Sequence, residues 1–131
     1  MDEFEDIKEL AISESRRLLE ESSQLLTKGV NPEQVIAEVF QKIHTVKSNV
    51  ALIPQAKSLS VSLQNLETVL ARLRDEKSAL KEDVTSSVLN IVDLTLTHLE
   101  NIQDSKNNIE LEKEIMKSSV NLRMRMASLK K

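Results

Sequence analysis

Only three residues of this 131-residue chain strongly disfavour a helix interior: Gly29, Pro32 and Pro54. Glycine and proline mark the turns of most folds, so a chain with one glycine and two prolines must consist of long, uninterrupted elements. Apolar residues recur at three- and four-residue spacing along most of the chain, which is the helical period. Since 40% of residues are hydrophobic but only 2% aromatic, the core must be aliphatic. These features predict an all-α fold.

The three helix-breaking residues divide the first half of the chain into three helices. The first should run from about residue 2 to residue 28 and end at Gly29. Asn31 as N-cap and Pro32 at the first helical position should begin the second. Pro54 should end it in a tight reversal over residues 51–55, so that the third helix lies antiparallel to the second. The expected core positions are Phe4, Ile7, Ala11, Leu18, Leu19, Leu25 and Leu26 in the first helix, Val35, Ile36, Val39, Ile43, Val46 and Val50 in the second, and Leu59, Leu63, Leu66, Leu70 and Leu73 in the third.

Two polar segments divide the second half of the chain. Residues 75–81 predict a connection, and residues 104–108 separate a fourth helix from a fifth. The expected apolar positions are Val84, Val88, Ile91, Val92, Leu94, Leu96, Leu99 and Ile102 in the fourth, and Ile109, Leu111, Ile115, Met116, Val120, Leu122 and Met124 in the fifth. Basic residues at Arg123, Arg125, Lys130 and Lys131 suit a helix C-terminus.

The predicted architecture is a single domain over residues 1–131. It is an antiparallel four-helix bundle over about residues 2–104, with an appended accessory fifth helix over about residues 107–129. The sequence leaves open whether this fifth helix packs on the bundle or mediates association.

Charge and composition exclude several classes of function. A net charge of -3 and a pI near 5.5 argue against a nucleic-acid partner. The absence of cysteine excludes disulfides and thiolate sites. No apolar run approaches the roughly 18 residues that span a bilayer, and residues 1–6 lack the basic and apolar regions of a signal peptide. We expect a cytoplasmic protein with no membrane partner.

The chemistry that this sequence offers centres on His44. On a helix, His44 should lie about 120° from the buried stripe of the second helix, with Lys47 between them. If the second and third helices are antiparallel, Glu67 and Gln64 can face His44. A Glu67 carboxylate that accepts from one imidazole nitrogen would leave the other nitrogen as an outward nucleophile, and Lys47 could offset phosphoryl charge. Ser48, one turn after His44, is small enough to leave room for a partner's backbone.

Other sites receive little support from the sequence. Two widely separated histidines, without a Glu-x-x-His pair or a cysteine, predict no metal site. His98 should be solvated or flank its helix. No glycine-rich phosphate loop is possible with one glycine, so we expect no nucleotide site and no kinase activity in this chain.

The residues from Phe40 to Lys47 and from Leu66 to Arg74, together with the five expected helices, resemble the histidine-containing phosphotransfer domains, whose motif is His-x-x-Lys-Gly. The likeness is greatest to the N-terminal phosphotransfer domains of CheA-type chemotaxis kinases. It implies that His44 is the phosphoacceptor, Lys47 the lysine of the motif and Glu67 the hydrogen-bond partner of the imidazole. Three departures are Ser48, where the family has glycine after the lysine, the loop around Ile53 and Pro54, where a glycine is usual, and Gln64, where CheA-like domains often carry a supporting histidine.

The resemblance implies a phosphoryl carrier rather than an enzyme. His44 would accept phosphate from ATP bound to a separate histidine kinase catalytic domain and pass it to an aspartate of a response-regulator receiver domain. The domain would need no cofactor of its own and would be monomeric in isolation. The alternative is a non-catalytic helical interaction module that has lost phosphorylation.

Overall fold

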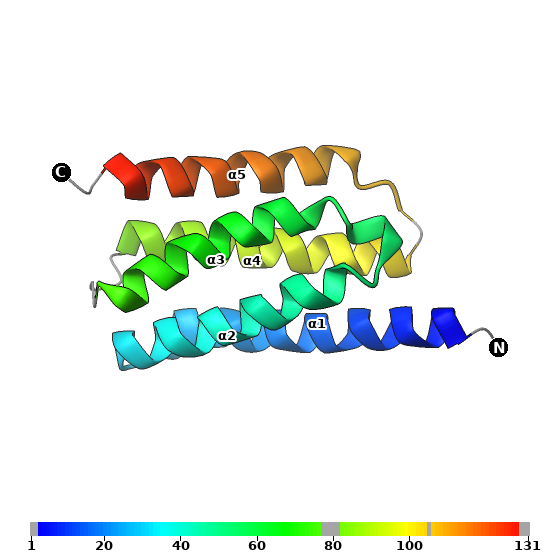
Figure 1. Cartoon of the computed structure of the whole chain (residues 1–131), viewed down its shortest axis with the longest axis horizontal. Coiled ribbons are helices and arrows are strands. Elements are labelled where there is room, and N and C mark those ends of the chain that lie inside the picture. Colours follow the sequence, from blue (N-terminus) through cyan, green and yellow to red (C-terminus); the bar gives the residue numbers. More distant parts are fainter. Residues whose placement is uncertain (1–2, 77–81, 105, 129–131) are drawn as a thin grey trace.

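A computed structural model of the chain describes residues 3–76, 82–104 and 106–128, and this described part is all-helical, with no strand. Five α-helices follow one another along the chain, with one 3-10 helix after the second (Figure 1). They are α1 (Glu3–Lys28), α2 (Pro32–Val50), η1 (Pro54–Ala56), α3 (Leu59–Asp75), α4 (Glu82–Gln103) and α5 (Ile109–Ser128). Residues 1–2, 77–81, 105 and 129–131, which the sequence assigns to the chain ends, helix ends and connections, lie outside the described residues.

The boundary between α1 and α2 forms where the sequence predicts it. The Gly29 amide closes the last turn of α1 by donating to the Leu25 carbonyl oxygen at 2.8 Å. Asn31 has an extended backbone, and its side-chain oxygen accepts from the Gln34 amide at 3.2 Å, which satisfies one of the free donors of the first turn. Pro32 occupies the first position of α2.

The connection between α2 and α3 is longer and more ordered than the predicted reversal at 51–55. Pro54 begins a 3-10 helix, because a proline without an N–H is tolerated at the start of a helical turn. Ile53 and Ala56 are both fully buried beneath this turn. The segment that joins the two helices thus contributes to the core, and η1 packs against α4.

The helices pack around one aliphatic core. α2 packs against α1 and α3, α5 packs against α3 and α4, and α4 packs against α1. Figure 1 shows α2 and α3 together on the near face of the molecule, with α1 and α4 behind them. Every core position predicted for α2 and α3 is buried, so the prediction for these two helices is confirmed.

α5 packs on the other helices and shares their core. Its residues Ile115 and Leu122 are almost completely buried in the same apolar cluster as the α3 leucines. Polar contacts add to this packing: the Asn65 side-chain amide donates to Ser119 Oγ at 3.3 Å in a buried bond, and Arg123 donates to Asn65 Oδ1 at 2.9 Å in a partly buried one. The fifth helix therefore contacts α3 directly beside the segment that carries Gln64 and Glu67.

Several predicted core positions are wrong. Phe4 and Ile7 are about half exposed, because the first turns of α1 extend past the end of α2 (Figure 1). In α5, Ile109, Val120 and Met124 are exposed. The residues of α5 that are buried instead follow a four-three-four spacing, namely Ile115, Ser119, Leu122 and Met126. This stripe includes a serine that an apolar pattern does not detect.

None of the described helices combines the length and the apolar character that a membrane-crossing helix requires.

Candidate functional site

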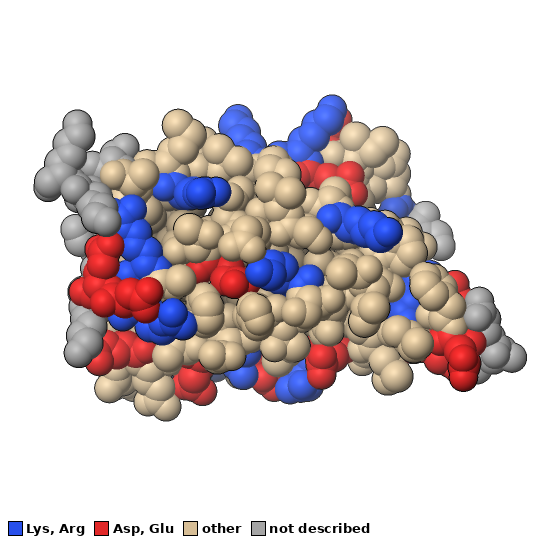
Figure 2. All heavy atoms as spheres, in the orientation of Figure 1, with Lys and Arg blue, Asp and Glu red and all other residues tan. Residues whose placement is uncertain are grey.

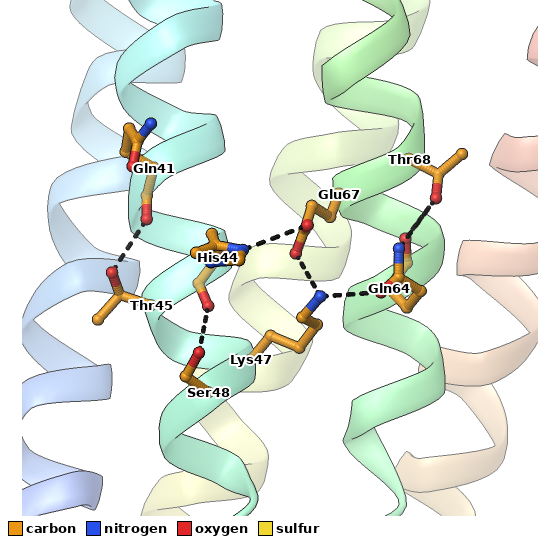
Figure 3. Close-up of polar contacts among 8 residues, drawn as sticks. All are labelled: Gln41, His44, Thr45, Lys47, Ser48, Gln64, Glu67 and Thr68. Carbon is orange, nitrogen blue, oxygen red and sulfur yellow. Dashed lines mark hydrogen bonds and ion pairs between the residues drawn. The ribbon is translucent and has the colours of Figure 1, made fainter.

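His44 lies on the exposed flank of α2, as the helical spacing predicts. Ile43 and Val46, its neighbours on the core side, are completely buried, whereas the His44 side chain is 52% exposed. Glu67 reaches towards it from α3 and is only 13% exposed. The leucine stripe of α3 is buried and sets this direction, because Leu63, Leu66 and Leu70 anchor the helix with Glu67 at the edge of the α2–α3 seam. Figure 3 shows the two side chains pointing at each other across that seam.

The contact between His44 and Glu67 selects one form of the imidazole. His44 Nδ1 lies 3.2 Å from Glu67 Oε1. A carboxylate accepts, so Nδ1 carries the proton in this contact and the lone pair remains on Nε2. Among the residues that the structure describes, none hydrogen-bonds to Nε2. An exposed nitrogen lone pair with a fixed partner on the opposite side of the ring is the arrangement of an imidazole nucleophile.

Lys47 joins the same carboxylate to Gln64. Its Nζ forms an ion pair with Glu67 Oε2 at 2.9 Å and donates to Gln64 Oε1 at 2.8 Å. The Oε2 atom is buried, and the Lys47 contact is an ion pair rather than a well-directed hydrogen bond. Gln64 is fixed in turn because its amide donates to Thr68 Oγ1 at 3.3 Å. The ammonium of Lys47 thus balances the charge of Glu67 a short distance from His44 (Figure 3).

Ser48 lies one turn beyond His44 and is exposed. Its hydroxyl donates to the His44 carbonyl oxygen at 3.2 Å, so it folds back on its own helix and does not project from it. Thr45 does the same towards Gln41 at 3.1 Å. Neither hydroxyl therefore projects from α2 beside His44. Figure 2 shows that the face over α2 and α3 is mostly uncharged, with adjoining acidic and basic groups near its middle.

Sequence reasoning brought together His44, Lys47, Gln64 and Glu67, and the structure places all four in one connected group. It missed three residues around them. Thr68 orients Gln64, and the Phe40 ring lies nearly parallel to the His44 ring, with 14° between the planes and 6.3 Å between the centroids. The third is Arg74, whose guanidinium carbon lies 4.3 Å from the Phe40 ring centroid. The spacing of Phe40, four residues before His44, could have revealed the ring pair. The contact of Arg74 with Phe40 could not have been predicted from spacing, because it depends on the conformation of a long side chain from another helix.

The prediction for His98 is wrong. This side chain is fully buried, with Nε2 3.3 Å from Glu112 Oε1 on α5, and its Nδ1 has no partner among the described residues. Burial lowers the pKa of His98, against the opposing effect of its hydrogen bond to Glu112. The contact with Glu112 on α5 accounts for the difference, because α5 packs over this part of α4.

No group of three or more potential metal ligands occurs among the residues that the structure describes. No family model matches the chain, and no curated protein or solved structure matches it. The functional inference therefore depends on the geometry of the His44 site and on the sequence motif around it.

Proposed function

We propose that this chain is a histidine-containing phosphotransfer domain of chemotaxis-type two-component signalling, with His44 as the phosphoacceptor. In this proposal α1 to α4 form the antiparallel four-helix bundle of such a domain, and α5 is its accessory helix. The observation that carries the proposal is the half-exposed His44 side chain, whose Nδ1 is held by Glu67 while no described residue hydrogen-bonds to Nε2. The protein would act in the cytoplasm as a monomeric carrier without a cofactor of its own.

The reaction follows from the form of the imidazole. The Nε2 lone pair attacks the γ-phosphorus of ATP held by a separate kinase domain, so that an N–P bond forms as the bond to the ADP oxygen breaks. The ring becomes cationic, and its Nδ1 proton remains shared with Glu67, which stabilises that charge. When a receiver aspartate oxygen attacks the same phosphorus, the N–P bond breaks and its electron pair returns to Nε2.

The other residues of the site have roles that differ in directness. Glu67 fixes the tautomer, and Lys47 places a positive charge beside the carboxylate, from which it could approach a phosphoryl oxygen by changing rotamer. Gln64 supports Lys47 without titrating. The exposed and compact Ser48 leaves the surface next to His44 open for the backbone of a receiver domain.

The test is phosphorylation of the purified chain by two independent donors. One is the catalytic domain of a chemotaxis-type kinase with labelled ATP, and the other is labelled phosphoramidate, which needs no protein partner. Acid-labile, base-stable label on His44 is expected, and ATP alone should give none. His44→Gln should keep its helical circular dichroism and accept no label, whereas His98→Gln should still be labelled, because His98 is buried away from the site.

Two results would overturn the proposal. Failure of the folded wild-type chain to take label from either donor would favour the non-catalytic interaction module. Undiminished labelling of His44→Gln would assign the phosphoacceptor to another residue.

A further inference from the structure

Three side chains, those of His44, Phe40 and Arg74, lie next to one another along the α2–α3 seam. The Phe40 ring, one turn before His44 on the same flank of α2, lies nearly parallel to the imidazole. The Arg74 guanidinium, from the last turn of α3, lies over the Phe40 ring at 4.3 Å. At that distance a guanidinium is attracted by the negative face of the ring. Phe40 thus lies next to both the imidazole and the guanidinium, and we call these three side chains the column.

The hydrogen bond to Glu67 cannot fix the imidazole by itself. It holds one ring atom, Nδ1, at 3.2 Å and leaves the ring free to rock about that contact. With 52% of its side chain exposed, His44 has little packing that would stop such motion. A second contact on the face of the ring, away from the Nδ1 edge, would restrict the remaining torsion.

We propose that Phe40 and Arg74 are positioning residues for His44, with the Phe40 ring holding the plane of the imidazole and Arg74 holding the Phe40 ring. The inference rests on the proposed function in one respect, that the oriented nitrogen is the one phosphorylated. Nucleophilic attack on phosphorus requires the Nε2 lone pair to lie in line with the leaving group, so a ring that rocks is less often productive. Neither Phe40 nor Arg74 touches the reacting atoms.

A purely structural explanation of the column makes different predictions. Phe40 is partly buried and packs against the core, and Arg74 also pairs with the neighbouring Asp75 at 3.1 Å. If packing were the whole role, changes at these residues would lower stability and leave His44 in its present tautomer and orientation. Positioning instead predicts that His44 changes while the rest of the domain does not.

The chain is favourable for a direct measurement, because it contains only two histidines. Long-range proton–nitrogen NMR of the imidazoles therefore gives one exposed ring, His44, and one buried ring, His98, as an internal reference. The variants are Phe40→Leu, Phe40→Tyr and Arg74→Gln. Arg72→Gln is the matched control, because Arg72 lies on the same helix and pairs with Glu76 instead of Phe40.

In Phe40→Leu and Arg74→Gln, the His44 nitrogens should shift from the single Nδ1-protonated form towards a mixture of tautomers, with His98 unchanged. The rate constant for phosphorylation at saturating donor should fall about two- to tenfold, as expected for the loss of one ring or cation contact, with KM unchanged. Phe40→Tyr should restore both properties, and Arg72→Gln should alter neither.

The inference is overturned if Phe40→Leu and Arg74→Gln keep the wild-type His44 spectrum, or if Phe40→Tyr behaves like Phe40→Leu. Should Phe40→Leu not fold, Arg74→Gln decides alone. The NMR measurement needs no phosphoryl donor. If these variants show the tautomer effect but the wild-type chain takes no label, the proposed function is refuted and the positioning role is supported.

Discussion

Acidification from pH 7 to pH 5 should destabilise this domain through one buried side chain, His98. Its imidazole is fully buried between α4 and α5, and among the described residues only Nε2 has a partner, the Glu112 carboxylate at 3.3 Å. In the neutral form with the proton on Nε2, the buried Nδ1 is an unfilled acceptor. Protonation would turn it into a buried N–H donor without an acceptor, which costs roughly 1–3 kcal/mol for such a group.

The direction of the effect follows from linkage between protonation and folding. Burial lowers the pKa of His98 in the folded protein, whereas the unfolded chain should titrate near the ordinary value of 6.5. Well above pH 6.5 the residue is neutral in both states, and its favourable contribution is fully present. Below that pH the unfolded chain binds the proton first, so the free energy of unfolding falls. The slope from one such group is at most about 1.4 kcal/mol per pH unit and levels off below the pKa of the folded state.

The assay is urea unfolding at intervals between pH 5 and pH 8 for the wild type, His98→Gln and Ile91→Val. The wild type should lose stability relative to His98→Gln as the pH falls below 6.5. Ile91→Val, a fully buried substitution in the same helix that does not titrate, should give a curve parallel to the wild type and lower by about 1 kcal/mol. Glu21, whose pKa is lowered by its contacts with Lys42 and Arg17, loses its contribution only as the pH falls below about 4.5, outside this window.

Parallel curves for the wild type and His98→Gln over the whole range would refute the reasoning. They would mean that His98 binds protons equally well in the folded and unfolded chain, so that burial does not lower its pKa.

Three further substitutions test other parts of the molecule. Glu67→Ala should keep the fold and slow phosphorylation by about five- to a hundredfold, because a tautomer-fixing hydrogen bond of roughly 1–3 kcal/mol is lost; an unchanged rate would make Glu67 a bystander. Ser48→Arg should shift the thermal midpoint by only a few degrees and impair transfer from phosphorylated His44 to a receiver. If phosphorylated Ser48→Arg transfers to the receiver at the wild-type rate, the receiver docks on another face. Gly29→Ala should destabilise by about 1–3 kcal/mol in urea unfolding, since its Cβ would lie 2.5 Å from the Leu25 carbonyl oxygen; wild-type stability would show that the backbone shifts freely here.

The extent to which the fold could be predicted depends on how local its determinants are. Asn31 and Pro32 specify the start of α2 through contacts within one turn, and the structure contains those contacts. The buried stripes of α2 and α3 follow equally directly from helical spacing. The exposed Phe4 could not have been predicted in this way, because periodicity gives the face of a helix but not the length of its neighbour.

The α5 helix shows the same limit. Its apolar residues are spread around the helix, and the packed stripe includes Ser119, which is buried because Asn65 and the Met116 carbonyl oxygen satisfy its hydroxyl. A buried serine of this kind depends on a partner from another helix, and the sequence carries no local sign of it. The exposure of Val120 and Met124 follows once that stripe faces α3 and α4.

The candidate site was predictable because it lies on two helices joined by a short connection. The chain reverses at Pro54, so a residue one turn further from Pro54 on α2 lies opposite a residue one turn further from Pro54 on α3. Sequence spacing alone therefore pairs His44 with Glu67 and Lys47 with Gln64. By the same register Phe40 lies opposite Ala71, about one turn before Arg74, so its contact with Arg74 depends on the reach of a long side chain. The part of the site set by backbone geometry could be inferred from spacing, whereas the contact that we propose orients the imidazole required side-chain conformations.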